Sequence, residues 1–77
     1  MWPPDRVIIA PANENEREAV RTAQRALNLN VTGDMDEATK ASLRAVQHLF
    51  KLPVSGVLDR ATAEALDQLK HPSLRED

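Results

Sequence analysis

Cysteine and tyrosine are absent from this 77-residue sequence, and the only large aromatic residues are one tryptophan and one phenylalanine. Without cysteine, neither a disulfide framework nor a thiolate metal site can form. With so few rings, the hydrophobic 42% of the chain consists mostly of alanine, leucine and valine. Such small aliphatic side chains suit closely packed helices.

Long apolar runs and a strong net charge are missing too. The formal charge is −2, so long-range attraction toward nucleic acid or anionic lipid is not expected, and neither is predicted as a partner. No apolar run approaches the roughly 18 residues of a membrane span. The start, Met1 to Asp5, lacks the basic and apolar regions of a signal peptide. We therefore expect cytoplasmic synthesis, with possible incorporation into a virion or other assembly.

The first 14 residues are predicted to form an extended arm. Pro3, Pro4 and Pro11 disfavour helix on either side of them. Between them, residues 7–10 form a short, largely β-branched apolar stretch with no obvious strand in the chain to pair with. The arm either folds back over the helices or docks on another molecule. In the second case the docking residues are Trp2, Val7, Ile8 and Ile9.

Three amphipathic helices are predicted in residues 15–70, a single domain, followed by a polar C-terminal tail at 71–77. The first begins near Asn13 or Asn15, and Asn15 with Glu18 resembles a capping box. The second and third begin at Asp36 and Asp59. The residues that we expect to face the core are Ala19, Val20, Ala23, Ala26, Leu27, Leu43, Val46, Leu49, Phe50, Ala65, Leu66 and Leu69.

An internal repeat is the clearest pattern in the sequence. A shift of 23 residues lays 31–39 over 54–62, and extends the match to Gln24 over Gln47 and Leu43 over Leu66. The repeated unit is therefore a helix, a tight corner and the start of the next helix.

Each position of the corner has a physical role. Gly33 and Gly56 supply a position where positive φ is expected, and Asp36 and Asp59 are predicted N-caps. Thr39 and Thr62 fall three residues after the caps, within hydrogen-bonding reach. Met35 and Leu58 precede the caps as hydrophobic staples. Two such corners joining three helices predict an all-α, compact three-helix bundle with an extended N-terminal arm.

These motifs resemble the peptidoglycan-binding domain family. The pattern comprises Val20, Gln24 and Leu27, then 33–47, then 52–66, and spans about residues 16 to 70. The resemblance implies a three-helix module that attaches cell-wall hydrolases to peptidoglycan without chemistry of its own. The chain departs from the family pattern in its shorter connection after the first helix and in its lack of sugar-facing aromatic rings.

The sequence contains no recognisable pattern of catalytic residues. The only histidines, His48 and His71, have no patterned acid partner, and a zinc site would need a third ligand. We interpret Asp36 and Asp59 as caps rather than as a catalytic pair, because both stand in the same context. The prediction is a protein that is not an enzyme and holds neither metal nor cofactor.

Cationic side chains follow two of the helices. The candidate binding residues are Arg17, Arg21 and Arg25, and their repeat equivalents Lys40, Arg44 and His48. They either form a solvated face, with Glu14, Glu18 and Glu37 offsetting part of the charge, or bind carboxylates of wall peptides, anionic wall polymers or an acidic protein.

Two functions follow as hypotheses. The first is a non-catalytic binding module whose partner is peptidoglycan of the bacterial cell wall, or that serves as a docking piece. The alternative is a structural or decoration subunit of a larger assembly, such as a phage virion, held to another protein by its N-terminal arm.

Overall fold

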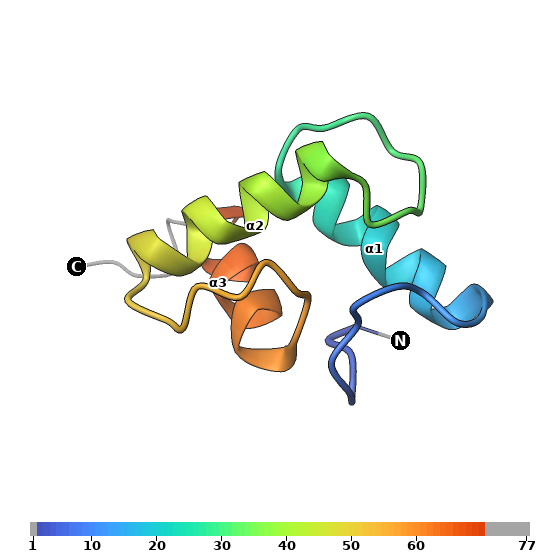
Figure 1. Ribbon diagram of the computed structural model, residues 1–77, viewed down its shortest axis with the longest axis horizontal. Coiled ribbons are helices and arrows are strands. Elements are labelled where there is room, and N and C mark those ends of the chain that lie inside the picture. The colour runs from blue at the N-terminus through green and yellow to red at the C-terminus, as the bar shows by residue number, and fades with distance from the viewer. Residues whose placement is uncertain (1, 71–77) are drawn as a thin grey trace.

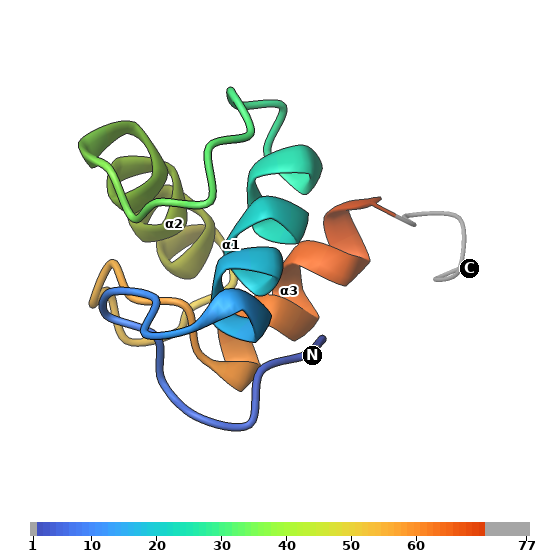
Figure 2. The same ribbon diagram turned by 90° about the vertical axis from the view of Figure 1, so that its right-hand side faces the viewer.

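The computed structural model describes residues 2–70, which form three helices preceded by an extended arm (Figure 1). The helices are α1 (Glu14–Ala26), α2 (Glu37–Leu49) and α3 (Arg60–Lys70). Helix α3 packs against both α1 and α2 (Figure 2). The predicted all-α three-helix bundle is confirmed, while the predicted tail, 71–77, with His71, lies outside the described residues.

Helix α1 begins at the earlier of the two predicted positions. Asn13 has an extended backbone, and its side chain accepts a hydrogen bond from the Glu16 amide at 2.9 Å. The Glu16 carboxylate in turn accepts from the amide of Ala12 at 2.8 Å. The expected box of Asn15 and Glu18 was wrong, because a cap at Asn13 places Asn15 inside the first helical turn.

Helices α2 and α3 begin at the predicted aspartates. Asp36 accepts from the Thr39 amide at 2.9 Å and from its hydroxyl at 2.6 Å. Asp59 accepts from the Thr62 amide at 2.9 Å. Both corners pass through a glycine with positive φ, as predicted: 82° at Gly33 and 77° at Gly56.

One aliphatic core lies between the helices and the arm. Its buried residues are Ile8, Ala19, Val20, Ala23, Leu43, Val46, Leu58, Ala63, Ala65 and Leu66. Two predicted core residues were wrong, since Leu49 is 65% exposed and Leu69 is 39% exposed. At about 100° per residue, Leu49 points about 120° away from Leu43 around α2. Leu69 stands in the last turn of α3, where a helix has neighbours on fewer sides.

The arm folds back onto its own chain. Ile8 is only 1% exposed and forms an isolated antiparallel bridge with Leu58, with N···O distances of 2.8 and 3.1 Å. The Trp2 indole donates to the Asp67 carboxylate at 3.1 Å and packs against the core. The sequence showed no pairing partner because Leu58 belongs to a corner rather than to a strand. Val7 and Ile9, on either side of Ile8, remain exposed.

Candidate binding surface

A buried glutamine holds each corner together. The side-chain oxygen of Gln24 accepts from the amides of Thr32 and Gly33, both at 2.9 Å, and its nitrogen donates to Thr32, Asp34 and Thr39 at 3.0 Å. Gln24 is fully buried, and its bonds to Gly33 and Thr39 are buried with it. They tie the end of α1 to the beginning of α2.

Gln47 repeats this arrangement at the second corner. It accepts from the amides of Ser55 and Gly56 at 2.9 Å and donates to Ser55, Val57 and Thr62. The two glutamines are equivalent in the sequence repeat, but their role in the corners was not predicted. The signal that could have revealed it was a polar residue at a repeated position inside an apolar pattern.

An arginine lies across the glycine of each corner. A Cβ added at Gly33 would lie 3.2 Å from Nε of Arg21, and one at Gly56 would lie 3.1 Å from Nη1 of Arg44. The positive φ thus favours glycine, which also leaves room for the arginine. The aliphatic part of both arginines consequently belongs to the fold.

The predicted cations of α1 are all paired with carboxylates. The pairs are Arg17 with Asp34 at 2.9 Å, Arg21 with Glu14 at 2.9 Å and Glu18 at 2.7 Å, and Arg25 with Glu18 at 3.0 Å. Hydrogen bonds from Arg21 and then Arg25 lower the pKa of Glu18 below its ordinary value. Those from Arg21 to Glu14 and Glu18 raise the pKa of the guanidinium. The positive charges of Arg17, Arg21 and Arg25 are therefore compensated by carboxylates of the domain itself.

The predicted cations of α2 are placed differently. Lys40 pairs with Glu37 at 3.0 Å. Arg44 and His48 are exposed and make no ion pair within residues 2–70. The structure thus separates the six predicted binding residues into a compensated group on α1 and a partly uncompensated group on α2.

Two hollows occupy related places beside the corners. One, of about 340 Å³, is lined by Asn28, Leu29, Asn30, Thr32, Asp36, Ala38 and Thr39. The other, of about 200 Å³, is lined by Phe50, Leu52, Ala61, Glu64, Ala65 and Gln68. Leu29 and Leu52 are repeat equivalents, as are Ala38 and Ala61. The first hollow is rich in amide, hydroxyl and carboxylate groups, and the second is largely apolar.

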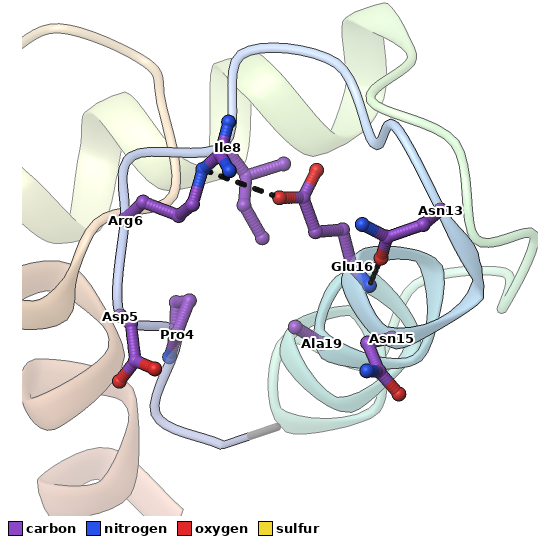
Figure 3. A pocket seen from close by; sticks show the side chains of 8 residues that line it. All are labelled: Pro4, Asp5, Arg6, Ile8, Asn13, Asn15, Glu16 and Ala19. Carbon is purple, nitrogen blue, oxygen red and sulfur yellow. Dashed lines mark hydrogen bonds and ion pairs between the residues drawn. The ribbon is translucent and has the colours of Figure 1, made fainter.

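A third hollow, of about 180 Å³, lies between the arm and the start of α1 (Figure 3). The Arg6 guanidinium meets the Glu16 carboxylate across it at 3.6 Å. Ile8 and Ala19 form its apolar side. Because Glu16 also accepts from the Ala12 amide, this ion pair belongs to the packing of the arm.

Across the described residues, no group of three or more His, Cys, Asp or Glu side chains is arranged to hold a metal ion. None of the helices in residues 2–70 has the length and apolarity to cross a bilayer.

The fold and its two corners define a class of protein: a small helical module made by duplicating one helix and corner unit. The family model described as a putative peptidoglycan binding domain matches the chain twice, at residues 14–43 and 36–66. The two matches together cover more than half of the sequence, and the chain belongs to the peptidoglycan-binding domain family. Neither a curated protein nor a solved structure matched it.

Proposed function

We propose that this chain is a non-catalytic module that attaches to the peptidoglycan of bacterial cell walls. The observation that carries the proposal is the double family match, in which each matched stretch contains one of the two structural corners. Each of these corners is built around one buried glutamine. The local structure that the two matched stretches share therefore supports the proposal at both corners.

The polar hollow beside the first corner suits a glycan. Its side chains include Asn28, Asn30 and Asp36, which offer both donors and acceptors. Peptidoglycan sugars present hydroxyl and acetamido groups that such side chains can bind without stacking on aromatic rings. The scarcity of aromatic residues is therefore compatible with recognition through hydrogen bonds.

Co-sedimentation with purified insoluble peptidoglycan tests the proposal. We expect the protein to be enriched in the pellet relative to cellulose, a polysaccharide that lacks both the acetamido groups and the peptide stems. A circular-dichroism spectrum of the same sample verifies that the three helices are folded. Equal recovery on peptidoglycan and cellulose would exclude a specific attachment.

A second candidate is a structural or decoration subunit of a larger assembly, such as a phage virion. It is favoured by one observation: Val7 and Ile9 expose apolar side chains on either side of the buried Ile8. In that case the protein should co-migrate with intact particles in a density gradient. Replacing both residues with serine should release it from the particles without changing its thermal melt. Unchanged co-migration of that variant would argue against arm-mediated docking.

A further inference from the structure

The two repeats differ in how they compensate equivalent cations. Arg21 and Arg44 occupy the same repeat position, and both lie across a corner glycine. Arg21 is held by Glu14 and Glu18. The residues 23 positions after these glutamates are Glu37, which pairs with Lys40, and Ala41, which has no charge.

The corner itself shows the same difference. Asp34, which pairs with Arg17 at 2.9 Å in the first repeat, is replaced by Val57 in the second. Two of the three carboxylates that neutralise α1 thus have uncharged equivalents beside α2. The positive charge of Arg44 has no compensating carboxylate within the described part of the chain, although the whole sequence is acidic.

The stem of Arg44 also packs against the second corner. A Cβ at Gly56 would lie 3.3 Å from Cγ of Arg44 and 3.1 Å from Nη1, so the side chain rests on the corner backbone. Holding a long side chain in one position reduces the conformational entropy that binding would otherwise cost. His48 follows at i+4, and residues at this spacing are neighbours on one helix face. Both side chains are exposed.

From this asymmetry we propose that Arg44 and His48 form an anion-binding site that holds carboxylates of the peptide stems of peptidoglycan. The inference rests on the proposed attachment to peptidoglycan and adds the chemical group that is recognised. A guanidinium binds a carboxylate through two parallel hydrogen bonds, and a neighbouring imidazole supplies a further nitrogen. Arg17, Arg21 and Arg25 have structural roles instead, because the domain's own carboxylates occupy them.

Stem carboxylates fit better than a polyanion such as a wall phosphate polymer. A polyanion gains affinity from many simultaneous cation contacts. Here the cationic site is small, and the α1 side of the domain carries Glu14, Glu18 and Asp34 within a chain of net charge −2. Isolated carboxylates spaced along a glycan match a site of this size.

The test compares two double variants in the peptidoglycan co-sedimentation assay. Arg44→Gln with His48→Gln should weaken binding about three- to tenfold, as expected for the loss of two exposed charged contacts. Arg21→Gln with Arg25→Gln changes the equivalent positions of the first repeat and should weaken binding less than about twofold. Thermal melts verify that both variants are folded.

A second experiment leaves the protein unchanged and alters the polymer. Coupling methylamine to the peptidoglycan carboxylates with a carbodiimide should reduce wild-type binding to the level of the Arg44 and His48 variant. That variant should bind untreated and amidated polymer alike. Removing wall phosphate polymers by acid extraction should leave wild-type binding unchanged.

The possible results separate failure of the proposed site from failure of the proposed function. Wild-type binding by the Arg44 and His48 variant, equal losses in both double variants, or insensitivity to amidation would overturn the proposed site while leaving attachment to peptidoglycan intact. Loss on acid extraction alone would assign the site to phosphate rather than carboxylate. Failure of the wild type to bind any of these polymers would overturn the proposed function and the site with it.

Discussion

Gln24 and Gln47 show how single residues stabilise this small domain. Each corner contains backbone amides that have no helical partner, and a buried amide without a partner destabilises the folded state. The glutamine side chain carries both donors and an acceptor, so one residue satisfies several groups at once. Among the described residues, no buried side-chain nitrogen or oxygen lacks a hydrogen bond.

We predict that Gln47→Leu lowers the free energy of unfolding by about 2–3 kcal/mol, because the amides of Ser55 and Gly56 lose their acceptor. Urea denaturation of the purified protein measures this change. The control is Gln68→Leu on the exposed part of α3, which should change stability by less than about 0.5 kcal/mol. Equal stabilities for the two variants would mean that the hydrogen bonds contribute little.

The capping carboxylate of Asp36 should make stability depend on pH. The side-chain hydroxyl and then the backbone amide of Thr39 lower the pKa of Asp36 below its ordinary value. A pKa lowered by folding adds stability that is present above the unfolded value, near 4, and that is lost as the pH falls through the folded value. Asp36→Asn can still cap but cannot ionise.

Thermal melts from pH 7 to pH 2 should therefore show wild type more stable than Asp36→Asn at neutral pH, with the difference shrinking below about pH 4. For each protein, the melting temperature at pH 7 is the reference for the values at lower pH. A difference that stays constant across this range would show that ionisation of Asp36 does not contribute.

At the scale of the element, the corners and helix starts could be predicted because their determinants lie within a few residues of one another. Gly33 with Asp36, and Gly56 with Asp59, define where each helix begins. The buried face was less predictable near the helix ends. Leu49 fits an apolar pattern, but the neighbouring helices do not cover it.

The two leucines of α2 provide a direct comparison. Leu43→Ala should lower the free energy of unfolding by about 2–5 kcal/mol, because Leu43 is fully buried and its removal leaves a cavity. Leu49→Ala, on the same helix but 65% exposed, should change it by less than about 0.5 kcal/mol. Urea unfolding monitored by circular dichroism measures both. Similar losses would contradict the observed burial.

At the scale of the whole molecule, the arm is an integral part of the fold. Ile8 completes the core and pairs with the backbone of Leu58, and Trp2 reaches Asp67 of α3. In a domain this small, one buried isoleucine is a large share of the apolar surface that folding removes from water. Loss of the arm should therefore destabilise the helices as well.

Adjacent isoleucines test this role of the arm. Ile8→Ala should destabilise the domain by about 2–5 kcal/mol, whereas Ile9→Ala, at a residue that is 71% exposed, should have an effect below about 0.5 kcal/mol. Differential scanning calorimetry measures both variants. If Ile8→Ala melts like wild type, the arm contributes little to stability.

Part of the candidate site could also be predicted from the amino-acid sequence. The cationic residues and the glutamates that offset them could be identified, since Arg21 and Glu18 stand three positions apart on one helix. The pairing of Arg17 with Asp34 could not, because it joins α1 to the corner that follows it. The same holds for the contact between Arg44 and the Gly56 corner.

Local chemistry was enough to define the duplicated corner, its caps and the three helices, because backbone conformation there depends on near neighbours. The place of the arm, the exposure of Leu49 and the contact of Arg44 with the Gly56 corner arose from packing. Trp2 and Asp67, for example, lie 65 positions apart in the chain. Burial and charge compensation depend on which distant surfaces meet, and that follows from how the helices fit together in space.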